Sequence, residues 1–221
     1  ELNGRRFTVA NVNTGANTFE LTDQAGNVNT TSFTTYTSGG VLSRVYTLVS
    51  PYAEADLFQV KFTQSADVMY LFHPTYPTRK LTRRSDTKWS CTLLKYLDGP
   101  YMTTNATTTT LTPGAATGNA VTMTASSVVG INGGDGFKTT DVGRLIRLKE
   151  GSVWGWCRIV GWTSTTVVTV DIASTLTSVA AKTSWRLGLY SDTTGWPGAG
   201  TFHEDRLVTL GNTSEPERGD T

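Results

Sequence analysis

The stretch that decides the fold runs from residue 50 to residue 84 and reads SPYAEADLFQVKFTQSADVMYLFHPTYPTRKLTRR. Apolar side chains alternate with polar ones at Val60 and Phe62, and a second apolar run covers residues 68–72. Alternation with a period of two is typical of a β-strand, whose successive side chains point to opposite faces of a sheet. The polar break QSAD at residues 64–67 separates the runs, so the stretch predicts two strands joined by a turn.

The second run is apolar at every position, which is typical of a strand covered on both faces. We therefore predict that Val68, Tyr70 and Phe72 are buried on one face of the sheet, and that Met69 and Leu71 are buried on the other.

The rest of the chain favours the same fold class, all-β. About a fifth of the residues are threonine, and β-branched side chains suit the pleated surface of a sheet. No long window has apolar residues at helical spacing without a Gly, Thr or Pro interrupting it. Strands are expected at residues 6–11, 18–22, 41–50, 120–126, 144–149, 155–161 and 166–172.

Composition divides the chain into four parts. Residues 1–102 are predicted to hold an N-terminal β-hairpin module and a platform of strands. The low-complexity stretch TTNATTTTLTPGAATGN at residues 103–119 is predicted to be a linker. Residues 120–184 are expected to form an inserted small β-barrel or sandwich, and residues 185–221 to return to the platform and end in a tail.

Charge and cysteine content exclude several broad classes. The 221 residues include 19 Lys and Arg against 18 Asp and Glu, so no overall field attracts the chain to DNA or an anionic membrane. No apolar run approaches the roughly 18 residues of a membrane span. Cys91 and Cys157 are predicted to be buried free thiols, as expected of assembly in a reducing cytoplasm. The first residue is Glu1 rather than Met, which indicates a piece of a longer protein.

Signals for catalysis are weak. The two histidines, His73 and His203, have no companion ligands at metal spacing. The glycine-rich residues 130–140 (GINGGDGFKTT) lack the Gly-Lys-Thr of a phosphate loop. A glycoside hydrolase would need two carboxylates about 5 to 9 Å apart, which a sequence cannot show. We therefore expect no enzyme activity, cofactor, metal or small-molecule substrate.

Two charged groups are candidate interaction sites. The basic cluster around Arg79, Arg83 and Arg84 has three interpretations: a solvated edge that discourages strand pairing, an inter-subunit ion-pair surface, or a contact with DNA phosphates. The run Glu204, Asp205 and Arg206 is interpreted as a surface or interface ion-pair network, because neighbours on a strand point to opposite faces.

Two tryptophans suggest an alternative function, the binding of carbohydrate. Trp154 and Trp156 would share one face of a strand and could form a platform for a sugar ring, although core packing is the default for tryptophan.

Three tracts resemble a known family: residues 50–84 with Asp98-Gly99-Pro100-Tyr101, Asp141-Val142-Gly143-Arg144 with Ile146, and WRLGLYSDTTGWPGAGTFHEDRL at residues 185–207. Together they resemble the tail nozzle, or tail tubular B-type, virion proteins of short-tailed bacteriophages and prophages. These are packing and turn motifs, and they cover about half of the chain.

The resemblance implies a non-enzymatic ring protein of the virion tail, assembled in the cytoplasm of the host bacterium. It implies a partial propeller-like platform, a homo-oligomer, docking to other tail proteins around the DNA exit channel, and sequence-independent contact with DNA. The alternative is a carbohydrate- or receptor-binding module of a phage tail.

Overall fold

The computed structural model describes residues 2, 4–35, 37–41, 43 and 45–221. The chain forms two compact units, Glu1–Thr47 and Leu48–Thr221. The fold is all-β, as the sequence predicts, with 44% of the chain in strands and 6% in helix. The described helical residues form short 3-10 turns: η1 (Glu54–Gln59), η2 (Asn132–Gly134) and η3 (Thr139–Asp141).

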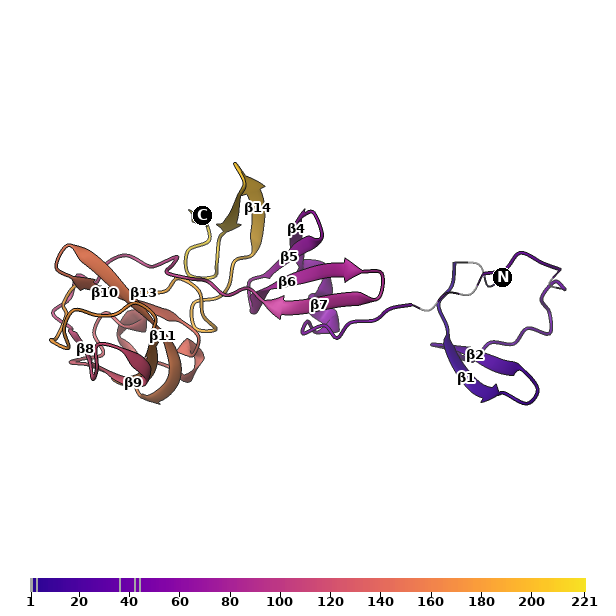
Figure 1. Ribbon diagram of the computed structural model, residues 1–221, viewed down its shortest axis with the longest axis horizontal. Coiled ribbons are helices and arrows are strands. Elements are labelled where there is room, and N and C mark those ends of the chain that lie inside the picture. Colours follow the sequence, from indigo (N-terminus) through magenta and orange to yellow (C-terminus); the bar gives the residue numbers. More distant parts are fainter. Residues whose placement is uncertain (1, 3, 36, 42, 44) are drawn as a thin grey trace. The chain divides into compact units, whose positions relative to one another are not determined.

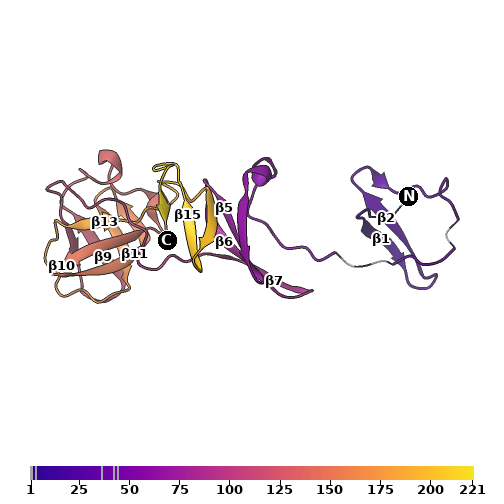
Figure 2. The same cartoon turned by 90° about the horizontal axis from the view of Figure 1, so that it is seen from above.

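The first unit is a small antiparallel sheet whose hairpin is visible in Figure 2. Strand β1 (Thr8–Asn13) pairs with β2 (Thr18–Asp23), which pairs with β3 (Gly26–Asn27). The β1–β2 turn is stabilised by the Asn13 side chain, which accepts a hydrogen bond from the Ala16 amide at 3.0 Å. The predicted hairpin is confirmed. The strand expected at residues 41–50 falls partly outside the described residues, at 42 and 44, and its described residues carry no strand.

The deciding stretch provides three strands of a four-stranded antiparallel sheet in the second unit, and the residues after it add the fourth (Figure 1). Its strands lie in chain order: β4 (Lys61–Ser65), β5 (Val68–His73), β6 (Tyr76–Ser85) and β7 (Lys88–Leu93). The β4–β5 turn falls at the QSAD break, where Ala66 has a positive φ of 49°. The two strands and the turn predicted from this stretch are thus confirmed.

A second sheet covers one face of this four-stranded sheet. It consists of β14 (Ala199–His203), β15 (Arg206–Leu210) and β16 (Gly219–Asp220). The Phe72 ring lies directly over Gly200, where a Cβ atom would overlap it. Tyr70 meets Phe202 edge-on, with ring centroids 5.7 Å apart. Phe72 is therefore fully buried.

The opposite face is less covered than the sequence predicts. Met69 and Leu71 are half-buried, as are Val68 and Tyr70 on the covered side. The prediction named five residues as buried, and it is wrong for all of them except Phe72. The described residues provide a covering sheet on one side, whereas the other side keeps apolar side chains in contact with solvent.

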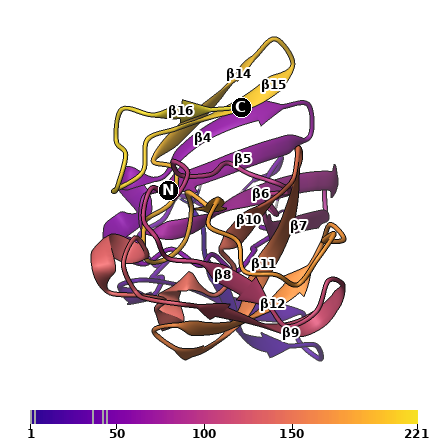
Figure 3. The ribbon, with the colours of Figure 1, turned by 90° about the vertical axis from the view of Figure 1, so that its left-hand side faces the viewer.

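The largest sheet has six strands and curls around its own core (Figure 3). The order across this curled sheet is β13 (Trp185–Leu187), β10 (Leu145–Glu150), β11 (Val153–Ser164), β12 (Val167–Ile172), β9 (Gly118–Ala125) and β8 (Leu111–Pro113). All its pairings are antiparallel.

Backbone hydrogen bonds join the two edges of the curled sheet. Leu111, in β8, and Lys182, just before β13, exchange both amide hydrogen bonds at 2.9 Å. The chain before β8 also runs along β13, since the Met102 amide donates to the Leu187 carbonyl oxygen at 2.8 Å. The edges of the curled sheet are therefore paired with each other, which blocks their addition to another chain.

The interior of the curled sheet is the core of the second unit. Alternate residues of each strand point inward, as Ile146 and Leu148 do in β10, with Cys157 beside them in β11. Gly155 leaves the space that the buried Leu176 side chain occupies. The other buried members are Leu111, Val121, Met123, Ala125, Ile131, Phe137, Ile159, Val168, Val170, Trp185 and Leu187.

The curled sheet extends beyond residues 120–184 at both ends. Strand β8 lies within residues 103–119, the predicted linker, and β13 lies within residues 185–221, the predicted return to the platform. Strand β8 has three residues, too few for alternation to be recognised, and β13 is recognised only through its pairing with β10. Strand β14 packs on β4 and β5 of the four-stranded sheet.

Both cysteines are free, as predicted, but they differ in burial. Cys157 is fully buried in the core of the curled sheet, and this burial raises the pKa of its thiol to about 12. Cys91 is half-buried in β7, opposite Leu81, so its predicted full burial is wrong. It faces the incompletely covered side of the four-stranded sheet, with Met69 and Leu81.

This difference predicts the outcome of thiol modification. A thiol-specific reagent at neutral pH should modify Cys91 in the native protein and leave Cys157 unreacted, because only the exposed thiolate is nucleophilic. Addition of denaturant should expose Cys157, so that a second equivalent of the reagent reacts. Mass spectrometry of peptides identifies the modified residue, and rapid native modification of Cys157 would contradict the described core.

Candidate functional site

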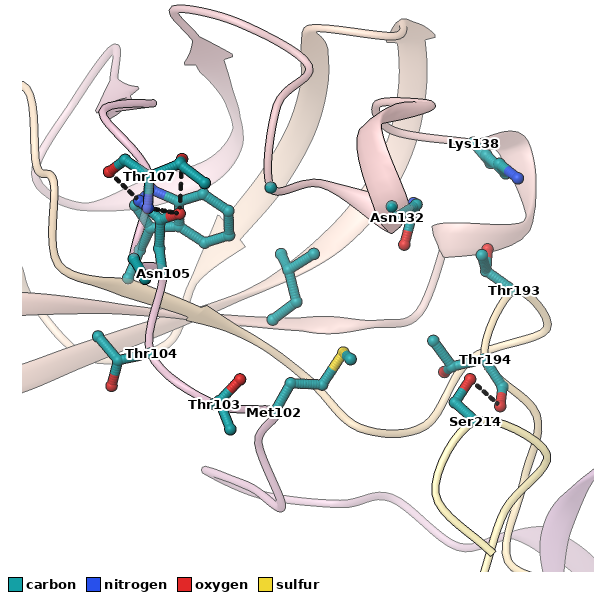
Figure 4. Close-up of a pocket in the computed structure, with 15 residues that line it drawn as sticks. Met102, Thr103, Thr104, Asn105, Thr107, Asn132, Lys138, Thr193, Thr194 and Ser214 are labelled. Carbon is teal, nitrogen blue, oxygen red and sulfur yellow. Dashed lines mark hydrogen bonds between the residues drawn. The ribbon is translucent and has the colours of Figure 1, made fainter.

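A pocket of about 450 Å³ opens beside the curled sheet (Figure 4). Its lining comes from three parts of the chain: residues 102–107, the loops around Asn132 and Lys138, and Thr193, Thr194 and Ser214. The Ser214 hydroxyl donates to the Thr194 carbonyl oxygen at 3.0 Å. Hydroxyl and amide groups therefore share the wall with the apolar side chains of Met102, Trp185 and Leu187.

A buried ion pair holds the loops on one side of this pocket. Arg144 donates from Nη1 to Asp141 Oδ1 at 2.9 Å and to Asn132 Oδ1 at 2.7 Å. Its Nε donates to the Gly188 carbonyl oxygen at 2.7 Å. Burial lowers the pKa of Arg144, and the charge and hydrogen bond of Asp141 oppose that shift.

The second carboxylate oxygen of Asp141 organises the loop backbone. It accepts hydrogen bonds from the Lys138 amide at 2.9 Å and from Asn132 Nδ2 at 2.7 Å. Asp141 and Arg144 are both about 1% exposed or less, so the pair is a structural clamp. The glycine-rich loop at residues 130–140 is therefore anchored at this carboxylate.

The pocket can bind polar groups but offers little for acid–base chemistry. Among the described residues that line it, Lys138 carries the ionisable side chain, and that group pairs with Asp135 at 2.8 Å. The remaining polar side chains are hydroxyls and amides. The arrangement suits hydrogen bonding rather than proton transfer.

The basic cluster predicted as an interface divides between the faces of β6. Arg79 and Arg83 lie on one face with Leu81, Lys80 lies on the other, and Arg84 lies where the register with β7 shifts between Arg83 and Ser85. Arg83 pairs with Asp86 and, at 3.5 Å, with Asp67, all at the exposed ends of hairpins. Arg79 lies opposite Leu71 and Leu93, so its charge borders the incompletely covered face.

The second predicted interface group forms a turn and not a strand. Glu204 and Asp205 have positive φ values of 46° and 60°, and they connect β14 to β15 at the paired residues His203 and Arg206. Positive φ at both central residues is the geometry of a type I′ hairpin turn. Glu204, Asp205 and Arg206 are exposed, and no ion pair joins them in the described part of the chain. The described residues therefore form no ion pairs with one another here, and the expected interface role of Glu204, Asp205 and Arg206 stays a prediction.

The incompletely covered face of the four-stranded sheet exposes several apolar side chains. Phe62, Leu71, Arg79 and Leu93 lie opposite one another in a row across all four strands. Phe62 is 64% exposed and Leu93 is 49% exposed. Met69 and Leu81 form a second row beside the first, so we call this surface the open apolar face.

The open apolar face is accompanied by exposed apolar side chains in η1. Leu57 is 48% exposed and Phe58 is 96% exposed, and η1 leads directly into β4. The sequence gives no sign that these apolar side chains are exposed.

Trp154 and Trp156 share the outer face of the curled sheet, as predicted, since they lie opposite Lys149 and Arg147. Trp154 is engaged by two cations: the guanidinium carbons of Arg147 and Arg186 lie 5.5 and 5.1 Å from its ring centroid. A sugar platform on Trp154 would have to displace these cations. Sequence reasoning missed Arg186, which reaches this face only through the pairing of β13 with β10.

Within the described residues, no group of three or more His, Cys, Asp or Glu side chains could hold a metal ion. No helix in this part of the chain is long and apolar enough to cross a membrane. No family model matches the chain, and no curated protein matches it.

Proposed function

We propose that the chain is a non-enzymatic structural component of a bacteriophage tail, of the nozzle or hub type. It works by self-association and by docking to other tail proteins around the DNA exit channel. It resides in the virion and assembles in the cytoplasm of the host bacterium. The tracts at residues 50–84 and 185–207 that resemble tail nozzle proteins motivate this choice of family.

The observation that carries self-association is the open apolar face. Phe62 and Leu93 expose about half or more of their surface at its two edge strands, and Leu71 lies between them. Contiguous exposed apolar surface bordered by charge is typical of a protein interface. Arg79 and Arg83 supply that charge on the same face.

An unpaired strand edge supports the same proposal. Strand β7 ends the four-stranded sheet, and in the described part of the chain no other strand pairs with its outer side. Free edges of this kind pair readily with another chain. A second copy can therefore cover the open apolar face and extend the sheet at β7.

A charge on the open apolar face should disrupt the oligomer. We expect Leu93→Glu to weaken self-association at least tenfold, about 1.4 kcal/mol, because the interface would have to bury an unpaired carboxylate. Sedimentation velocity over a range of concentrations measures this change.

The matched control is Thr92→Glu, which places the same charge on the neighbouring exposed residue but on the opposite face of β7. It should leave the distribution of oligomers unchanged. Equal effects of both variants, or unchanged self-association of Leu93→Glu, would argue against the open apolar face as the interface.

A further inference from the structure

The outer face of the curled sheet gathers positive charge around Trp154. Arg147 and Lys149 alternate along β10, and Arg186 in β13 lies directly opposite Arg147. Like charges directly opposite one another in a sheet are destabilising. The arginine pair is therefore an arrangement that folding alone does not favour.

The fold compensates only part of this charge. Asp98 lies 3.2 Å from Arg147 Nε and accepts a hydrogen bond from its Nη2 at 3.3 Å. Trp154 stacks with both guanidinium groups, and Tyr101 with that of Arg147. Three cations against one carboxylate leave a net charge of +2 here.

The uncompensated groups are available for a ligand. Arg186 donates from Nε to the Thr104 hydroxyl at 2.7 Å, and its two terminal nitrogens have no partner in the described part of the chain. Lys149 is exposed and makes no ion pair with the described residues. Arg158, on the same face, is held by the Tyr96 and Gly143 carbonyl oxygens and lies opposite Asp171.

We propose that this surface, formed by Arg147, Lys149, Arg186 and Trp154, binds the phosphate backbone of duplex DNA without sequence preference. A guanidinium group presents paired N–H donors that match the oxygens of a phosphate. Trp154 stacks with Arg147 and Arg186 and holds both guanidinium groups in place. The groups that remain free to contact a ligand are charged N–H donors, which bind anions. Such contacts supply affinity but carry no sequence information.

The choice of DNA among polyanions rests on the proposed function. The proposal also moves the DNA contact from the basic cluster on β6 to the curled sheet. Arg83 is neutralised by Asp67 and Asp86, and Arg84 lies at an irregularity of β6 rather than in its regular register. The cations around Trp154 share one face, which a linear polyanion can contact together.

Fluorescence anisotropy with a labelled 30-base-pair duplex of arbitrary sequence tests the proposal. The parent should bind in low salt, with affinity that falls as salt increases. The double variant Lys149→Gln/Arg186→Gln should bind at least tenfold more weakly. For this variant, the slope of log K against log salt should be less negative by about 1.8. Each phosphate contact contributes about −0.9 to the slope, and the variant loses two of them.

The control Lys61→Gln/Lys88→Gln removes the same charge from exposed residues of β4 and β7, and should change affinity less than twofold. Lys149→Glu is a second variant, since this exposed side chain is dispensable for the core, and it should weaken binding at least as much as a single lost contact. Far-ultraviolet circular dichroism confirms that each variant is folded.

Absence of salt-dependent binding by the parent, or equal weakening in the control, would overturn the proposal. Binding to an anionic polysaccharide without binding to the duplex would also overturn it and favour a glycan surface. These outcomes are independent of sedimentation: loss of DNA binding with intact oligomers rejects only this surface, whereas DNA binding by a strict monomer rejects only the self-association.

Discussion

Replacement of Asp141 by alanine is expected to destabilise the second unit by about 3 to 5 kcal/mol, because it leaves the buried Arg144 guanidinium without its carboxylate. It also removes the acceptor for the Lys138 amide and for Asn132 Nδ2. Chemical denaturation followed by tryptophan fluorescence measures the loss. All tryptophans lie in residues 48–221, so the signal reports this unit.

Two variants separate the buried charge from loss of packing. The double variant Asp141→Ala/Arg144→Met also removes the unpaired buried cation, so it should be more stable than Asp141→Ala alone. Asp135→Ala breaks the exposed pair with Lys138 in the same loop region and should change stability little, because solvent screens that pair. A loss below about 1 kcal/mol for Asp141→Ala would contradict the clamp.

The second large effect is expected at Phe72, where the four-stranded sheet meets β14. Phe72→Ala should cost about 3 to 5 kcal/mol, because the ring is fully buried over Gly200 and no neighbour can fill the cavity. The same denaturation experiment measures this cost.

The matched control is Phe62→Ala, which makes the same substitution one strand away on the open apolar face. Because Phe62 is 64% exposed, its loss of stability in the monomer should be within about 0.5 kcal/mol. Similar losses for both variants would mean that the two faces of the sheet are equally covered, contrary to the description above.

Much of the fold could be predicted because the signals are local. Alternation places β5, β10, β11 and β12 within one to three residues of their observed bounds, and the QSAD break gives the turn after β4. Side-chain period is a property of a few adjacent residues, so no tertiary contact is needed to recognise it.

The failures depend on pairing between distant residues. Strand β8 has three residues and includes Pro113, so its threonine-rich surroundings hide it until Leu111 is seen to pair with Lys182. The Glu204-Asp205 turn lacks the Asn-Gly signal of a type I′ hairpin. Both segments acquire their structure from the strands beside them.

The candidate surfaces were predictable to a smaller extent. The sequence placed Trp154 and Trp156 on one face, but the stacking of Arg186 on Trp154 requires the register of β13 with β10. The exposure of Phe62 and Leu93 depends on which face β14 and β15 cover. Alternation shows that a strand has two faces, and only the tertiary fold decides which face meets a partner.

The central claim is self-association of the chain, and electron microscopy of the purified protein together with its mass in solution tests it most directly. We predict closed ring particles for the parent chain, and their loss in Leu93→Glu but not in Thr92→Glu. A parent that stays a monomer at every concentration measured would contradict the account.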